Sequence, residues 1–249
     1  MTQVAVVTGA SSGIGKACAL ALLAEGWQVA LVGRRADALQ ATIAQAGAHA
    51  AHALAVPTDV SKDEEVAQLF DTVVQHFGRV DLLFNNAGIS LPYTLPGDMS
   101  AQTWRQAVDV NLNGAFYCLS HAFKHMQAQS PQGGRIINNG SISAHVPRPG
   151  SIAYTATKHA ISGLTRAANL DGRALNIAVG QIDIGNVASD MTERMAKGVH
   201  QADGSIKPEA RMDMSAVVET FMTMARLPLS ANILFTTVMA TQMPYVGRG

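Results

Sequence analysis

A tyrosine and a lysine four residues apart, Tyr154 and Lys158, have the clearest potential for chemistry in this sequence. Residues at this spacing lie on one face of a helix, so a helix here would place the phenol beside the ammonium group. A tyrosine ordinarily has a pKa of about 10, and a cation within roughly 4–6 Å favours its phenolate form. We therefore expect Tyr154 to act as a general acid or base near neutral pH.

Ser141 lies shortly before this pair, just after the apolar run that begins at Arg135. A strand over that run would deliver the serine hydroxyl to the edge of a cleft, where it could hydrogen-bond a substrate oxygen. A tyrosine and a lysine at this spacing also occur on ordinary amphipathic helices. The interpretation therefore depends on the motifs elsewhere in the chain.

A glycine-rich turn near the N-terminus is the second such motif. The run from Gln3 to Thr8 predicts a short strand, and the pattern from Lys16 to Glu25 predicts a helix. Glycines between them would let the backbone approach a phosphate group, and the first N–H groups of the helix would attract its negative charge. The alternative is a tight turn without a ligand. The turn residues predicted to bind phosphate are Gly9, Ser11, Ser12, Gly13, Ile14 and Gly15.

Arg34 and Arg35 indicate which dinucleotide the turn would serve. They follow the next predicted strand, at the point where dinucleotide folds that select NAD usually place a carboxylate. Asp37 lies too far along, at the start of the following helix. Guanidinium groups can grip phosphate oxygens in pairs, so the two arginines favour NADP, with NAD as the alternative. A pair of solvated surface charges is the other interpretation.

Strands and helices alternate along the rest of the chain. Ser61 and Glu64 have the form of a capping box. Asn111 is an amide within an apolar segment and needs a hydrogen-bonding partner if it is buried. His121 and His125 have the spacing of metal ligands without further ligands nearby, so we expect no metal site. The predicted strands are 28–32, 49–56, 80–84, 135–139, 175–182 and 233–239, and the predicted helices are 38–46, 61–77, 101–129, 215–226 and one bearing Tyr154 that ends near 170.

This alternation predicts an α/β fold: one Rossmann-like domain over residues 1–249, with a doubly wound parallel sheet and helices on both faces. In such sheets a ligand lies beyond the carboxyl ends of the strands, where the glycine turn, Asn86, Ser141 and Gly185 all fall. The polar, aperiodic stretch over about 186–212 is predicted to be a substrate lid.

Composition excludes several other classes of partner. The 18 basic and 18 acidic residues balance, which leaves no electrostatic signature for nucleic acid or an anionic membrane surface. Cys18 and Cys118 are isolated and do not form a disulfide framework. The chain passes from Met1 directly into a strand-like run, and it contains no apolar run long enough to span a bilayer. We therefore expect a soluble, cytoplasmic protein.

Taken together, these motifs make the sequence similar to the short-chain dehydrogenase/reductase family in its shorter form. The similarity covers nearly the whole chain, and the motifs occur in the family's order and spacing. The segments that carry it are Thr8 to Gly15, Asn85 to Gly88, Asn111, Ser141 and Tyr154 to Lys158.

The resemblance implies a role for each site residue. Tyr154 would be the acid or base, Lys158 would bind the nicotinamide ribose, Ser141 would orient the substrate carbonyl, and Asn111 would hold a water that links Lys158 to solvent. The cofactor-binding residues implied, besides the glycine turn, the arginine pair and the Tyr154–Lys158 pair, are Asp59, Val60, Asn86, Ala87, Gly88, Gly185 and Val187.

The resulting hypothesis is an oxidoreductase that transfers a hydride between NADP(H) and an alcohol or carbonyl group of a small molecule. The alternative is a catalytically silent NADP(H)-binding sensor or structural protein. The resemblance also implies a homodimer or homotetramer, and the low share of charged residues, 14%, agrees with subunit contacts.

Overall fold

The first strand, β1 (Val4–Thr8), is buried along its whole length in the computed structural model, which describes residues 2–189, 192, 195 and 198–246. Its side chains alternate between two cores: Val4 and Val6 pack into one, and Ala5 and Val7 into the other. A strand covered on both faces needs apolar side chains at successive positions, which explains the unbroken run in the sequence.

In the described part of the chain, β1 belongs to a seven-stranded parallel sheet with the order β3-β2-β1-β4-β5-β6-β9. The direction of strand addition reverses between β1 and β4, which confirms the predicted doubly wound sheet. The remaining strands are β2 (Gln28–Gly33), β3 (Ala53–Pro57), β4 (Leu82–Asn85), β5 (Gly134–Asn139), β6 (Ile177–Ile184) and β9 (Phe235–Val238).

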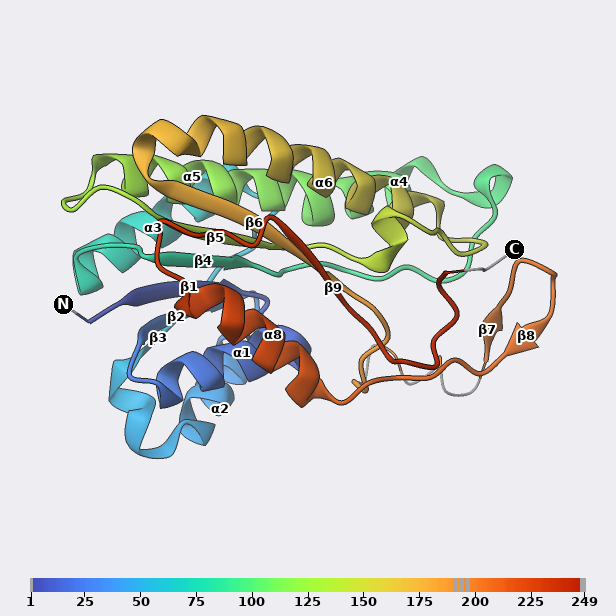
Figure 1. The fold of residues 1–249 in the computed structure, drawn as a ribbon, viewed down its shortest axis with the longest axis horizontal. Helices are drawn as coiled ribbons and strands as arrows, with labels where there is room; N and C mark the ends of the chain where they lie inside the picture. Colours follow the sequence, from blue (N-terminus) through green and yellow to red (C-terminus); the bar gives the residue numbers. More distant parts are fainter. Residues whose placement is uncertain (1, 190–191, 193–194, 196–197, 247–249) are drawn as a thin grey trace.

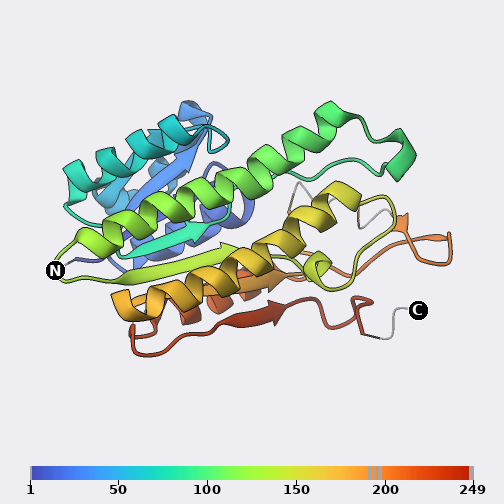
Figure 2. The same ribbon diagram turned by 90° about the horizontal axis from the view of Figure 1, so that it is seen from above.

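Helices cover both faces of the sheet, as Figures 1 and 2 show. One face carries α1 (Gly13–Ala24), α2 (Ala36–Gln45) and α8 (Met214–Arg226), and the other carries α3 (Asp63–Phe77), α4 (Ala101–Val108), α5 (Gly114–Ala128) and α6 (Ile152–Gly172). On the first face, the rings of Phe84 and Phe221 lie 4.4 Å apart between their centroids and are fully buried. Each such side chain contributes about 1.5–3 kcal/mol of burial free energy.

The predicted strand over 49–56 is wrong in its first half. Residues Gly47–His52 form a 3-10 helix, and only Ala53–Pro57 pair with β2. Gly47 has a φ of +54°, so the chain turns tightly after α2 instead of extending at once. Alternating alanine and histidine fits either structure, which is why the sequence pattern placed the strand too early.

The predicted capping box of Ser61 and Glu64 is also wrong. Helix α3 begins at Asp63 after Lys62, which makes no side-chain cap. The hydroxyl and amide of Ser61 instead donate to Asp59 Oδ1 at 2.8 and 3.1 Å, and the Asp59 amide donates to Glu65 Oε2 at 2.8 Å. The loop before the helix is therefore held by Asp59 and not by the helix cap.

The long helical region predicted over 101–129 is interrupted in the structure. A π-helical turn, Asp109–Asn113, separates α4 from α5. Such turns carry one extra residue and often occur at functional sites. This turn contains Asn111, which is only 2% exposed.

The other predicted elements lie within a few residues of the observed ones. The predicted lid over about 186–212 contains an antiparallel hairpin of β7 (Val199–His200) and β8 (Ile206–Lys207), which extends beyond the end of the sheet in Figure 1. Residues 190–191, 193–194 and 196–197 of this stretch lie outside the described residues. None of the helices in the described ranges has the length and hydropathy needed to cross a lipid bilayer.

Candidate active site

A cavity of about 630 Å³ opens beyond the carboxyl ends of the central strands. Residues that follow β1, β2, β3, β4, β5 and β6 all contribute to its wall, as expected for a doubly wound sheet. Of the predicted site residues, Gly15 and Asn111 do not line it. Those that do are Gly9, Ser11, Ser12, Gly13, Ile14, Arg34, Arg35, Asp59, Val60, Asn86, Ala87, Gly88, Ser141, Tyr154, Lys158, Gly185 and Val187.

Two glycines of the turn are required by close backbone packing. A Cβ atom on Gly15 would lie 2.4 Å from the carbonyl oxygen of Gly9, and one on Gly9 would lie 2.8 Å from Asn86 Nδ2. Gly9 also has a φ of +69°, which other residues rarely adopt. A side chain at either position would push the turn away from the strand ends, so these glycines keep the turn against the wall of the cavity.

The first turn of α1 is arranged to accept an anion. Ser12 stands at the N-cap in an extended conformation, but its side chain makes no capping hydrogen bond, and the first turn contains no acidic residue. Helix N-termini carry unpaired N–H groups and partial positive charge. Because Ser12 and Gly13 line the cavity, a phosphate group placed there would meet these N–H groups directly.

Asn86 and Asn139 join the ends of three strands. Two hydrogen bonds to Thr8 at the end of β1 hold Asn86. Its backbone N–H donates to Thr8 Oγ1 at 2.9 Å, and its Nδ2 donates to the Thr8 carbonyl at 2.8 Å. Asn139 Nδ2 donates to Asn86 Oδ1 at 2.8 Å. These bonds lie where the strand order reverses, and they hold the floor of the cavity rigid.

Arg34 and Arg35 lie at the mouth of the cavity, and both are exposed. Asp59 faces them from the end of β3. Burial opposes ionisation of this carboxyl group, but hydrogen bonds from Ser61 and the charge of Arg34 outweigh burial and keep the pKa of Asp59 below its usual value. Arg34 therefore interacts electrostatically with Asp59, and both arginines border the cavity.

Helix α6 brings Tyr154 and Lys158 together, as the sequence predicts. The Lys158 ammonium nitrogen lies 5.6 Å from the centre of the Tyr154 ring. Lys158 is 6% exposed, and its Nζ donates to the Asn139 carbonyl at 2.7 Å. Because this bond fixes the end of a long, flexible side chain, the positive charge is held beside the phenol.

Ser141 lies at the carboxyl end of β5 and is 5% exposed. Its Oγ accepts a hydrogen bond from the Ser143 amide at 3.1 Å. A hydroxyl group that accepts in this way keeps its own hydrogen for donation, since it has one donor and two acceptor sites. The side chain can therefore donate to an oxygen atom in the cavity.

Asn111 lies behind the cavity wall. Its Oδ1 accepts from the Ile89 amide at 2.7 Å, and its Nδ2 donates to the Ile89 carbonyl at 3.0 Å. The predicted need for a partner is met by this pair of bonds, which attach the loop after β4 to the π-helical turn. The histidines with metal-ligand spacing, His121 and His125, lie elsewhere. Their Nε2 atoms are 3.0 Å from Asp63 Oδ1 and 3.6 Å from Asp71 Oδ1, respectively.

Sequence reasoning missed several contacts around the cavity. The Asn139 carbonyl is one, because nothing in the sequence shows that a lysine nineteen residues later reaches it. Arg148 is another: its Nη2 donates to Glu209 Oε2 at 2.5 Å and to Asn186 Oδ1 at 2.8 Å. The rings of Tyr93 and His200 are in tilted contact, with 4.1 Å between their centroids, which joins the loop after β4 to the β7–β8 hairpin.

The segment after β9 covers the end of β6. Gly185 donates to the Val238 carbonyl at 2.9 Å, and the Asn186 amide contacts Met243 Sδ at 3.4 Å. Met243 also packs on Ile142, beside the catalytic candidate Ser141. The C-terminal segment therefore packs behind the cavity wall, against Ile142, Gly185 and Asn186, which line it.

Comparison with known proteins shows the family to which this chain is similar. The sequence profile described as short chain dehydrogenase matches residues 3–200. A similar curated protein is the 3-oxoacyl-acyl-carrier-protein reductase of Synechocystis sp., which is 39% identical over 194 residues, or 78% of this chain and 77% of that protein.

Solved structures share the fold. The acetoin dehydrogenase YohF from Salmonella typhimurium is 31% identical, with a TM-score of 0.82 and coverage of 96% of this chain and 95% of that one. ElxO, solved with NADP bound, is 26% identical, with a TM-score of 0.83 and coverage of 95% and 97%.

Proposed function

Since this chain belongs to the short-chain dehydrogenase family of oxidoreductases, we propose that it transfers a hydride between NADP(H) and an alcohol or carbonyl group of a small molecule. One observation supports this most strongly: Tyr154, Lys158 and Ser141 border the same cavity as the glycine-rich turn. The dinucleotide-sized site and the proton-transfer group are thus adjacent, as hydride chemistry requires.

The residues of the cavity fit a nicotinamide dinucleotide. Gly9 and Gly15 leave no room for a Cβ atom, and the uncapped start of α1 offers N–H groups to the pyrophosphate. We assign Asp59 and Val60 to the adenine, Asn86, Ala87 and Gly88 to the adenosine side, and Gly185 and Val187 to the nicotinamide side. When bound, the nicotinamide supplies or accepts the hydride.

Tyr154 moves the proton in this proposal. In the reductive direction its hydroxyl donates a proton to the carbonyl oxygen, and in the oxidative direction its phenolate removes the proton of the alcohol. Ser141 donates a hydrogen bond to the same oxygen and so stabilises the negative charge that develops there. Lys158, held by Asn139, stabilises the phenolate and binds the ribose hydroxyls.

Asn111 has a supporting role in the proposal. By clamping Ile89 to the π-helical turn, it shapes the wall between the cavity and the backbone of α4 and α5. We assign to this turn the water that connects Lys158 to solvent, so that protons lost or gained by Tyr154 can be replaced.

The activity can be tested with a panel of carbonyl compounds. The panel contains a 3-oxoacyl thioester and a vicinal diketone, chosen from the names of the similar proteins, together with simple ketones and aldehydes. We expect oxidation of NADPH, measured by its absorbance, with at least one of them. Tight binding of NADPH measured by calorimetry, without turnover of any carbonyl in either direction, would instead favour a silent sensor.

The choice of NADP over NAD depends on Arg34 and Arg35. Replacing both by Ser removes up to two charge-assisted contacts to the 2′-phosphate, so the Kd for NADPH should rise about 10- to 100-fold. NADH lacks that phosphate and serves as the matched control ligand: its Kd should change by less than about threefold. An equal weakening of both cofactors, measured by calorimetry, would contradict the assignment.

The remaining proposals concern organisation. Residues 1–249 form one NAD(P)-binding domain, with the stretch over about 186–212 closing over the substrate. The protein is cytoplasmic and forms a homodimer or homotetramer. Apolar side chains on α5 and α6 are exposed: Phe116 is 48% and Leu170 is 60% exposed. Contact with another subunit would bury such side chains, so they support the proposed oligomer.

A further inference from the structure

Asp183 is a buried carboxylate close to the candidate active site, and it does not line the cavity. It lies near the end of β6 and is 1% exposed. Three groups surround it: the Ser141 amide donates to Oδ1 at 3.0 Å, Gln181 Nε2 donates to Oδ1 at 2.7 Å, and His145 Nε2 lies 2.9 Å from Oδ2. A buried charge is tolerated only with such partners, so this carboxylate has a defined site.

Gly140 makes room for this carboxylate. A Cβ atom at that position would lie 2.0 Å from Asp183 Oδ1 and 2.5 Å from Gln181 Nε2. The backbone of Gly140 is not in the left-handed region, so the glycine is required by space and not by conformation. The residue directly before Ser141 is therefore matched to a carboxylate on the neighbouring strand.

The hydrogen bond from the Ser141 amide to Asp183 forms where the backbone hydrogen bonds between β5 and β6 have ended. The ladder between β5 and β6 ends with the pair Asn139 and Ile182, and the Gly140 amide makes the last backbone bond, to the Ile182 carbonyl at 2.9 Å. The next amide, that of Ser141, donates to the Asp183 side chain instead. Asp183 thus extends the hydrogen bonding of the strand by one residue, to the residue that faces the substrate.

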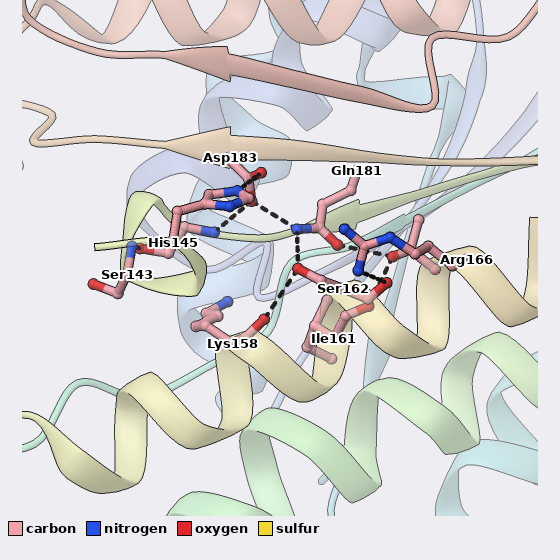
Figure 3. A network of polar contacts seen from close by, with 10 residues as sticks. Ser143, His145, Lys158, Ile161, Ser162, Arg166, Gln181 and Asp183 are labelled. Carbon is pink, nitrogen blue, oxygen red and sulfur yellow. Dashed lines mark hydrogen bonds and ion pairs between the residues drawn. The ribbon is translucent and has the colours of Figure 1, made fainter. Parts of the chain in front are cut away.

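The same carboxylate is connected to the helix that carries Tyr154 and Lys158. Gln181 Nε2 lies 3.0 Å from Ser162 Oγ, and Gln181 Oε1 accepts from Thr165 Oγ1 at 2.9 Å. Figure 3 shows Gln181 between Asp183 and Ser162, which belongs to α6. Buried networks of this kind make the relative placement of two elements rigid when every member has its partner.

From this geometry we propose that Asp183 is a positioning residue for Ser141. Its Oδ1 fixes the Ser141 backbone, and through it the hydroxyl that donates to the substrate oxygen, relative to Tyr154 on α6. The proposal rests on the proposed oxidoreductase function for its kinetic consequence. The hydrogen bond itself can be tested without any turnover.

A double-mutant cycle separates positioning from general stability. Removing one hydrogen-bond donor to a developing oxyanion typically lowers kcat by about 10²- to 10³-fold, and this is expected for Ser141→Ala. Asp183→Ala should lower kcat by about 10- to 100-fold, which is less than the loss for Ser141→Ala because the Ser141 hydroxyl is misplaced and not removed. In the Ser141→Ala background the same change should cost less than about threefold, because the group that it positions is gone. The Kd for NADPH should stay within about threefold throughout.

Two variants complete the design. Asp183→Asn keeps an acceptor oxygen for the Ser141 amide, so its kcat should remain within about threefold of wild type. Ser162→Ala removes one partner of Gln181 but keeps the bond from Thr165 to Gln181 and the bond from the Ser141 amide to Asp183, so its kcat should also stay within about threefold. If Asp183→Ala does not fold, Gly140→Ala displaces the carboxylate sterically and should show the same dependence on the Ser141 background.

A readout independent of activity is the exchange of the Ser141 amide hydrogen, followed by NMR. It should be slow in wild type and in Ser162→Ala, and clearly faster in Asp183→Ala. Equal losses of kcat in both Ser141 backgrounds, unchanged exchange, or a full loss in Asp183→Asn would overturn the positioning role. Absence of turnover in wild type, with the exchange pattern as expected, would overturn the proposed function and leave the contact established.

Discussion

Replacing Tyr154 by Phe should abolish measurable turnover and leave NADPH binding close to wild type. The change removes a single oxygen atom, the one from which the proton leaves in the proposed reaction. Loss of a general acid or base typically lowers the rate by about 10²- to 10⁴-fold. We expect a loss at the upper end, because the hydroxyl of Ser141 has no adjacent base and cannot take over the proton transfer of Tyr154. The measurement is kcat with the active carbonyl compound, together with the Kd of NADPH by calorimetry.

Tyr117→Phe is the matched control for this variant. Tyr117 lies on α5, packs against the core and does not line the cavity. Loss of its hydroxyl should change kcat by less than about twofold. Turnover of Tyr154→Phe at the wild-type rate would show that the proton comes from another group and would refute the mechanism.

Replacing Lys158 by Met should lower turnover and also weaken binding of the cofactor. Methionine keeps a chain of similar length but removes the ammonium group, which lies 5.6 Å from the Tyr154 ring centre and donates to the Asn139 carbonyl. A charge-assisted hydrogen bond contributes about 1.5–3 kcal/mol, or roughly 10- to 100-fold in affinity for the ribose. Because the phenolate also loses its neighbouring cation, kcat/KM should fall by about 10³-fold or more.

The two effects of Lys158→Met can be separated. Saturating NADPH restores any loss due to cofactor affinity, so the part of the loss that remains in kcat reports on Tyr154. Arg166→Met is the control on the same helix, since Arg166 stacks on Phe235 at 4.8 Å and lies outside the cavity wall. It should leave kcat within about twofold of wild type. A Lys158→Met protein with unchanged kcat would show that the lysine has no part in proton transfer.

Local patterns in the sequence were sufficient for the sheet and for the glycine turn. A short apolar run, a glycine cluster and a helix within a few residues specify one supersecondary unit, and the structure has β1 and α1 with Gly9 and Gly15 in contact. The pairing of Tyr154 with Lys158 was equally predictable, because helical periodicity alone brings the two residues to one face.

Competition between local signals explains the element boundaries that were wrong. Ser61 and Glu64 fit a capping box, but Asp59 offers Ser61 a nearer acceptor, and Glu65 is positioned to bind the Asp59 amide. These bonds satisfy the N–H groups of Asp59 and Ser61. Gly47 similarly allows a tight turn that alanine and histidine alone do not indicate.

Contacts between distant segments could not be predicted from the sequence. The Asn139 carbonyl accepts from Lys158 only because the fold places the first turns of α6 beside the carboxyl end of β5. Asp183 gave one readable signal, a carboxylate next to apolar residues in a mostly apolar run, which requires partners if it is buried. Two of its three named partners, the Ser141 amide and His145, are more than thirty residues away in the chain and become neighbours only when β5 and β6 pair.

Transfer of a deuterium label tests the central claim most directly. NADPH labelled with deuterium at the transferring position of the nicotinamide is incubated with the protein and the active carbonyl compound, and the alcohol is analysed by mass spectrometry. The proposed function predicts one deuterium on the carbinol carbon for every NADPH oxidised, and none formed by Tyr154→Phe. Alcohol that carries no label, or labelled alcohol formed equally well by Tyr154→Phe, would contradict it.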